Sequence, residues 1–180
     1  MLKLYVPESE QFDSKTNTFY NVKGQMLTLE HSLVSISKWE SKWKRPFLSE
    51  APRTYKESID YIRCMTVNQN VDPLVYNCLT PSMFKLINDY IGEDQTATTF
   101  KQDPNAKKSR EIVTSELIYY WMVSLNIPFE CQKWHLSRLL TLIRVCSIKN
   151  APAKKMSKRD IMAQNRSLNA ARRRAHHTRG

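Results

Sequence analysis

Residues 112–146 read IVTSELIYYWMVSLNIPFECQKWHLSRLLTLIRVC and contain the two strongest helical patterns in the chain. In the first pattern, one wide apolar face consists of Ile112, Val113, Leu117, Tyr120, Trp121 and Leu125. The second pattern places on one face Leu136, Leu139, Leu140, Ile143 and Cys146. Pro128 breaks the chain between them, because proline disrupts a helix interior. The short link favours an antiparallel helix pair, which we expect at the centre of the core.

Upstream of this pair, capping residues mark the starts of further helices. A helical period begins at Ser32 and continues to Pro46, and Thr54-x-x-Glu57 is a capping box for a second helix toward Met65. Asp72-Pro73 and Thr80-Pro81 predict a short helix near 73–78 and another near 81–91, which Gly92 ends. Residues 93–108 indicate a surface loop. Ser109 and Glu111 predict the start of the first helix of the pair.

The first thirty residues have the pattern of extended chain. Leu2, Leu4 and Val6 alternate with other side chains, and β-favouring runs at 18–22 and 25–29 flank Lys23-Gly24. Two such runs around a glycine predict a hairpin that turns at this dipeptide.

Three segments follow from these patterns: an extended or hairpin segment at 1–30, a helical core domain at 31–150, and a basic tail at 151–180. Ser157-x-x-Asp160 caps a charged tail helix, helical or partly disordered, with a narrow apolar stripe of Ile161, Leu168 and Ala175. The predicted fold is therefore mainly α: a small helical bundle centred on the antiparallel pair, with an N-terminal β-hairpin and a basic C-terminal helix.

Composition excludes several classes of protein. The 180 residues include only three glycines, too few for a glycine-rich phosphate-binding loop. No segment approaches the roughly 20 apolar residues of a membrane span, and the N-terminus lacks the apolar region of a signal peptide. The four cysteines are isolated from one another in sequence. We expect an intracellular protein with reduced cysteines.

The charge is concentrated in the tail. Residues 151–180 contain nine Lys or Arg and one Asp, whereas residues 1–150 contain nineteen Lys or Arg and sixteen Asp or Glu. Such a tail fits nucleic-acid binding, docking of an acidic protein partner, or simple solvation. We favour a protein partner, and the candidate partner-binding residues are Lys154, Lys155, Lys158, Arg159, Arg166, Arg172, Arg173 and Arg174.

A second, weaker candidate surface combines aromatic and basic residues. Trp39 and Trp43 lie one helical turn apart, beside Lys42 and Lys44. Interleaving of this kind can bind single-stranded nucleic acid by stacking. A helix also produces the same pattern when its tryptophans face the core and its lysines face water, and we favour this interpretation.

The residues offer little for catalysis. Cys131 and His135 are four apart on an expected helix, so both could face one metal ion or imitate a nucleophile and its base. Neither pattern has the further ligands or the orienting acid that it needs. We expect a half-buried thiol and an imidazole near the surface, with no catalytic, metal or cofactor-binding residues.

Three groups of segments carry a resemblance to a known family. They are Leu29-Glu30-His31-Ser32-Leu33 with Ser37-Lys38-Trp39-Glu40-Ser41-Lys42-Trp43 and Pro46-Phe47; Ser115-Glu116-Leu117-Ile118-Tyr119-Tyr120-Trp121-Met122 with Trp134-His135-Leu136-x-Arg138-Leu139-Leu140; and Lys154-Lys155-Met156-Ser157-Lys158-Arg159 with Leu168-Asn169-x-Ala171-Arg172. Together, over residues 27–180, they resemble the tail assembly chaperones of long-tailed (siphovirus-type) bacteriophages.

The resemblance implies a small helical protein without catalytic residues. It would bind the tape measure protein in the host cytoplasm during tail morphogenesis and be absent from the mature virion. A frameshifted longer form and a homo-oligomer are further implied partners. The alternatives are a basic phage nucleic-acid-binding protein and a minor structural protein of the tail or connector.

Overall fold

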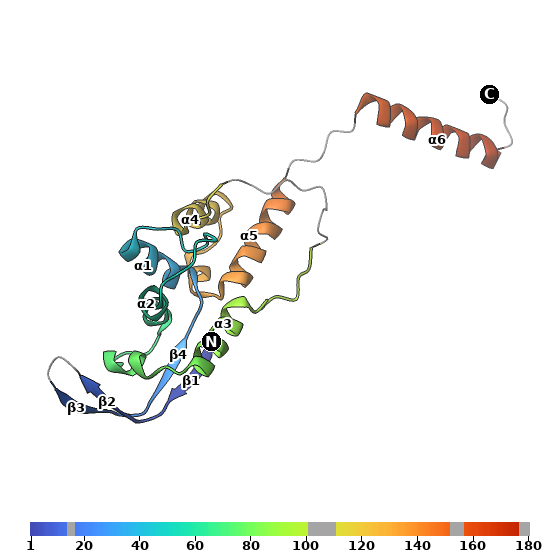
Figure 1. Ribbon diagram of the computed structural model, residues 1–180. Helices are drawn as coiled ribbons and strands as arrows, with labels where there is room; N and C mark the ends of the chain where they lie inside the picture. Colours follow the sequence, from blue (N-terminus) through green and yellow to red (C-terminus); the bar gives the residue numbers. More distant parts are fainter. Residues whose placement is uncertain (14–16, 101–110, 152–156, 177–180) are drawn as a thin grey trace. The chain divides into compact units, whose positions relative to one another are not determined.

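The computed structural model describes residues 1–13, 17–100, 111–151 and 157–176 (Figure 1). The chain forms two compact units, Met1–Ser147 and Ile148–Gly180. It is mainly helical with N-terminal β-strands. The elements in order are β1 (Leu2–Val6), β2 (Ser9–Asp13), β3 (Thr18–Val22), β4 (Gln25–Leu29), α1 (Leu33–Trp43), α2 (Tyr55–Met65), the 3-10 helix η1 (Pro73–Cys78), α3 (Pro81–Gly92), α4 (Ser115–Ser124), the 3-10 helix η2 (Phe129–Lys133), α5 (Leu136–Asn150) and α6 (Lys158–His176).

The predicted β-structure is present, but its turn is not at Lys23-Gly24. Strand β1 pairs antiparallel with β4, and β2 pairs antiparallel with β3. The register continues from one pair to the next, with Val6 opposite Gln25 and Ser9 opposite Val22. The strands therefore form one long, interrupted hairpin that reverses direction between β2 and β3 (Figure 1).

Gly24 has a different role from the expected turn. A side chain at this position would place its Cβ 2.5 Å from the hydroxyl of Tyr5 and 3.0 Å from the backbone nitrogen of Glu8. The glycine thus permits close approach of the two arms at the interruption. Proline, which cannot donate a ladder hydrogen bond, occupies position 7 on the opposite arm.

The predicted helix starts between residues 32 and 81 are confirmed. Ser32 and Thr54 each form a capping box, and the side chain of Thr80 accepts a hydrogen bond from the N–H of Met83. Each of these bonds satisfies one of the N–H groups left free at a helix start.

Helix α1 takes the central position in the unit Met1–Ser147. It packs against α2, α4 and η2, and its side chains Leu33, Ile36 and Trp39 are fully buried. Helix α5 presents the predicted face, with Leu136, Leu139 and Ile143 buried. Helix α4 packs chiefly against α1, and the described residues of α4 and α5 share no comparable contact. The predicted antiparallel pair is therefore not the centre of the core, and α1 occupies that place.

Helix α4 differs from the prediction in its start and in its rotation. It begins at Ser115, capped by Thr114, and residues 111–114 are not helical; Ser109 lies outside the described residues. Its fully buried side chains are Ile118 and Met122, whereas Tyr120 is 66% exposed. Because α4 is apolar on nearly all sides, the pattern did not determine which face would be buried.

In the part of the chain that the structure describes, no helix combines the length and apolar character needed to cross a membrane.

Candidate functional site

Helix α6 carries most of the candidate partner-binding residues. Ser157 starts the helix as predicted, since its hydroxyl accepts the N–H of Asp160 at 3.1 Å and donates to the carboxylate of Asp160 at 2.7 Å. All of its residues are exposed, including Lys158, Arg159, Arg166, Arg172, Arg173 and Arg174. Lys154 and Lys155 lie outside the described residues. One Asp accompanies these six cations, so the helix is strongly positive.

Apolar side chains interrupt the charged surface of α6. Ile161, Met162 and Leu168 are 44%, 63% and 48% exposed. Ile161 and Leu168 are seven residues apart and therefore lie on one side of the helix. Most of the stability of a helix in a protein comes from packing of its apolar side, so a partner that covers this side would stabilise α6.

The two tryptophans of α1 divide between core and surface. Trp39 is fully buried, and its indole N–H donates to the backbone oxygen of Glu57 at 3.0 Å. Trp43 is half-buried, and its indole N–H donates to the carboxylate of Asp60 at 2.8 Å. The rings are stacked, with centroids 6.2 Å apart. Only Trp43 can contribute to a binding surface.

The lysines around these tryptophans are exposed, in agreement with the favoured interpretation. Lys42 pairs with Asp60. Lys44 ends α1 in a left-handed conformation, φ 54°, and its N–H donates to the backbone oxygen of Glu40. Lys44 therefore has a structural role at the end of the helix, although its side chain is free to contact a partner.

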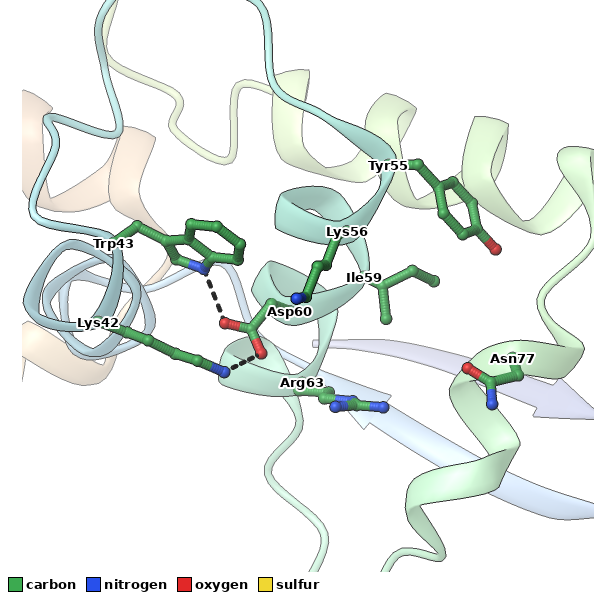
Figure 2. Close-up of a pocket in the computed structure, with 8 residues that line it drawn as sticks. All are labelled: Lys42, Trp43, Tyr55, Lys56, Ile59, Asp60, Arg63 and Asn77. Atoms are coloured by element: carbon green, nitrogen blue, oxygen red, sulfur yellow. Dashed lines mark hydrogen bonds and ion pairs between the residues drawn. The ribbon is translucent and has the colours of Figure 1, made fainter. Parts of the chain in front are cut away.

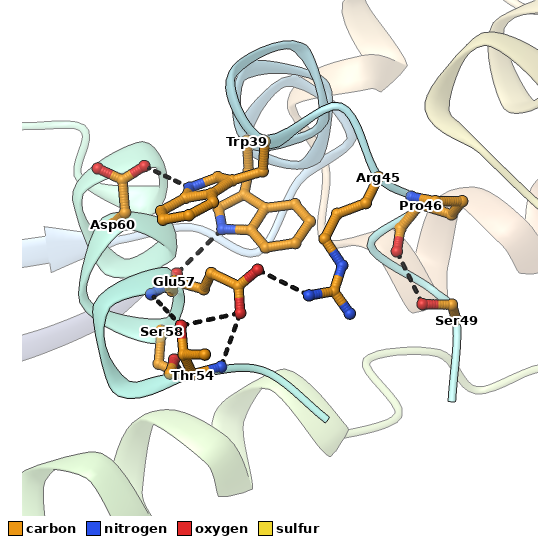
Figure 3. Close-up of polar contacts among 9 residues, drawn as sticks. Trp39, Arg45, Pro46, Ser49, Thr54, Glu57, Ser58 and Asp60 are labelled. Carbon is orange, nitrogen blue, oxygen red and sulfur yellow. Dashed lines mark hydrogen bonds and ion pairs between the residues drawn. The ribbon is translucent and has the colours of Figure 1, made fainter. Parts of the chain in front are cut away.

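Polar contacts below the tryptophans fix α1 against the start of α2 (Figure 3). The carboxylate of Glu57 accepts the guanidinium N–H of Arg45 at 2.7 Å and the backbone N–H of Thr54 at 2.7 Å. The Thr54 bond is the largest of the influences that lower the pKa of Glu57. Glu57 thus joins a capping box to an ion pair between two segments.

A pocket of about 400 Å³ opens beside this cluster. We define the α1–α2 pocket by its lining residues, Lys42, Trp43, Tyr55, Lys56, Ile59, Asp60, Arg63 and Asn77. Figure 2 shows Asp60 held by Lys42 and Trp43, with Tyr55 and Asn77 farther along the pocket. Burial raises the pKa of Asp60, but the hydrogen bonds and nearby cations outweigh it and hold the pKa below its usual value.

Sequence reasoning found only Lys42 and Trp43 of this pocket. Asp60 and Arg63 follow Lys56 by four and seven residues, so the three side chains share one side of α2. A charged side of a helix normally indicates a solvated surface, and nothing in the sequence brings it beside Trp43. The contact between α1 and α2 creates the pocket.

The expectation for Cys131 and His135 is wrong. Cys131 belongs to η2 and His135 precedes α5, so the two are not on one helix. His135 is buried, and the centroid of its ring lies 5.1 Å from that of the His31 ring. One ring nitrogen contacts the hydroxyl of Ser137, and the other contacts the backbone oxygen of Tyr90. The start of α5 packs against the residues before α1, because the N–H of Leu136 donates to the oxygen of His31.

His31 is the other half of this buried histidine pair. Its Nδ1 contacts the hydroxyl of Tyr61. Burial, with smaller effects from His135 and Arg53, lowers the pKa of His31 to about 4. Burial also raises the pKa of Tyr61. His31 is therefore a neutral, hydrogen-bonded part of the core at physiological pH.

Within the described ranges, no group of three or more His, Cys, Asp or Glu is placed to hold a metal ion. Over the same residues, every buried side-chain nitrogen or oxygen has a hydrogen-bond partner.

No protein-family model matches the sequence, and neither the curated proteins nor the solved structures include a significant match.

Proposed function

We propose that the protein is a non-catalytic protein-binding protein, a tail assembly chaperone of a long-tailed bacteriophage, and that α6 engages its partner. The observation that carries the proposal is the surface of α6. The helix buries none of its residues, yet it combines six cations with the exposed apolar side chains of Ile161 and Leu168. A helix of this kind gains stability by laying its apolar side in a groove of a partner.

The resemblance of residues 27–180 to tail assembly chaperones supplies the identity of the partner. A tape measure protein is long and helical and tends to aggregate through apolar surface. A homo-oligomer that presents several copies of α6 to one such chain would bind it more tightly than a single copy, because linked contacts add through multivalency even when each is weak. The protein would then act in the host cytoplasm and leave before the virion is complete.

Co-expression with the tape measure protein of the same phage tests this proposal. We expect a soluble complex that contains both chains. Ile161→Ser with Leu168→Ser should weaken capture by about tenfold or more, whereas Met162→Ser, at a neighbouring position about 100° around the helix from Ile161, should have a smaller effect. A tape measure protein that stays insoluble, or capture that is equal for all variants, would count against the proposal.

Two measurements separate the rival functions. Mass spectrometry of purified virions should not detect the protein, and stoichiometric retention would identify a structural component of the particle. Gel shifts across a salt series test nucleic acid, because affinity through phosphate contacts falls steeply with salt. Tight DNA or RNA binding at physiological salt that depends on Arg172, Arg173 and Arg174 would favour the nucleic-acid function.

A further inference from the structure

The α1–α2 pocket combines an excess of positive charge with an apolar wall. It contains three cations, Lys42, Lys56 and Arg63, and one carboxylate, Asp60. Lys42 and the indole N–H of Trp43 already engage both oxygens of Asp60. The charge of Asp60 is therefore satisfied inside the protein, and two cations remain for a ligand.

Contacts on the far side of the pocket hold Arg63 in place. Its guanidinium lies 5.1 Å from the centroid of the Tyr76 ring, and one nitrogen donates to the backbone oxygen of Pro73 at 3.3 Å. A guanidinium carries five N–H donors, so most of them remain for a ligand. Lys56 is exposed and has no hydrogen bond or ion pair among the described residues.

The apolar part of the pocket lies beside these cations (Figure 2). Ile59 is 7% exposed, and Trp43 is half-buried with its only N–H already used. Tyr55 is 65% exposed, and the centroid of its ring lies 5.7 Å from that of the Phe84 ring. These surfaces can cover an apolar side chain that lies next to an anionic group. A volume of about 400 Å³ suits a few side chains.

We propose that the α1–α2 pocket binds an acidic peptide segment of a protein partner, with a carboxylate against Lys56 and Arg63 and an apolar side chain against Trp43 and Tyr55. A peptide fits better than a nucleic-acid strand, because only two cations of the pocket, Lys56 and Arg63, remain for a ligand. Two cations suit one anionic group, whereas a nucleic-acid strand presents a continuous row of phosphates. The site belongs to the unit Met1–Ser147 and does not depend on the role proposed for α6.

Nuclear magnetic resonance of the full-length protein tests the site directly. The probe is a capped helical peptide with Glu and Leu one turn apart. The indole N–H signal of Trp43 should shift on titration, whereas that of the fully buried Trp39 should not. Trp43→Phe assigns the signal. If other signals saturate during the titration while the Trp43 signal does not shift, the peptide binds elsewhere, for example on α6. That result would overturn the inference.

Matched variants test the two halves of the pocket by fluorescence anisotropy with the same peptide, labelled. Lys56→Glu should weaken binding by about tenfold, and Tyr55→Ser should weaken it without a change of charge. Lys85→Glu makes the same charge change at an exposed position on α3 outside the pocket, so it should alter affinity by less than about twofold. Equal effects of Lys56→Glu and Lys85→Glu would show that only net charge matters.

Two competitors identify the ligand chemistry. Replacing Glu by Gln in the peptide, or Leu by Ala, should each reduce the affinity. A single-stranded oligonucleotide that displaces the peptide and shifts the Trp43 signal equally well would overturn the assignment to a protein partner. If Lys56→Glu loses peptide binding but still captures the tape measure protein, the pocket and α6 are separate binding sites. If the α6 variants capture the tape measure protein as well as the parent protein does, the role proposed for α6 is wrong, but the inference about the pocket is unaffected.

Discussion

The carboxylate of Glu40, on α1, accepts the backbone N–H of Ser115, the first residue of α4, at 2.8 Å. Its other oxygen accepts the backbone N–H of Phe47 at 2.7 Å. The side chain is buried, so one carboxylate fixes both the chain after α1 and the start of α4. Buried backbone N–H groups need such acceptors, because an unpaired one costs free energy.

Glu40→Gln should therefore destabilise the protein by about 1–3 kcal/mol. The amide has one acceptor oxygen in place of two, so its NH₂ group must face either Ser115 or Phe47. The free energy of unfolding in urea measures the effect. Glu50→Gln makes the same charge change at an exposed position and should be neutral. Equal stability of the two variants would mean that solvent replaces the lost acceptor.

The start of α4 also shows where sequence reasoning stops. Local signals identified the caps at Ser32, Thr54 and Thr80, because a cap depends on residues three apart. The contact between Glu40 and Ser115 spans 75 residues, and no local pattern contains it. The sequence alone therefore predicts the start of this helix at Ser109, whereas its cap is Thr114.

The same limit applies to the candidate sites. The charge of the tail is visible in composition, so the residues of α6 could be named in advance. The α1–α2 pocket depends on how two helices pack, and the burial of His135 depends on a contact with His31 more than one hundred residues away. No sequence pattern around the pocket residues or the two histidines indicates that they lie close together.

Acid should destabilise the protein through His31. Its pKa lies at about 4 in the folded state against an ordinary value of 6.5, so the unfolded chain binds this proton more readily. The contribution of His31 to stability is complete above about pH 6.5 and is lost as the pH falls toward about 4, by up to about 3 kcal/mol.

Unfolding in urea at neutral pH and near pH 4 measures this loss. Carboxylates titrate over part of the same range, so the control is His31→Asn, whose amide can keep the contact with Tyr61 but does not titrate. The variant should lose less stability on acidification than the parent protein. Parallel pH profiles for the two proteins would assign the acid sensitivity to other groups.

The capping box of α2 gives a prediction of intermediate size. The hydroxyl of Thr54 accepts the N–H of Glu57 at 3.3 Å and donates to its carboxylate at 2.9 Å. Thr54→Ala removes both bonds and should cost about 1 kcal/mol of unfolding free energy. Thr54→Ser keeps the hydroxyl and should restore most of it. A serine variant as unstable as the alanine variant would point to the lost methyl group instead.

Removal of the residues after Asn150 should leave the stability of the remaining protein nearly unchanged. No described residue of α6 is buried, so its loss exposes no core side chain, and single exposed changes alter stability by only about 0.5 kcal/mol. Thermal unfolding should stay cooperative, while capture of the proposed partner weakens. A chain ending at Leu142 is the control, since it also removes the buried Ile143, and it should melt at a lower temperature. If the chain ending at Asn150 loses cooperative unfolding as well, the tail must stabilise the core, and α6 would not be a separate binding element.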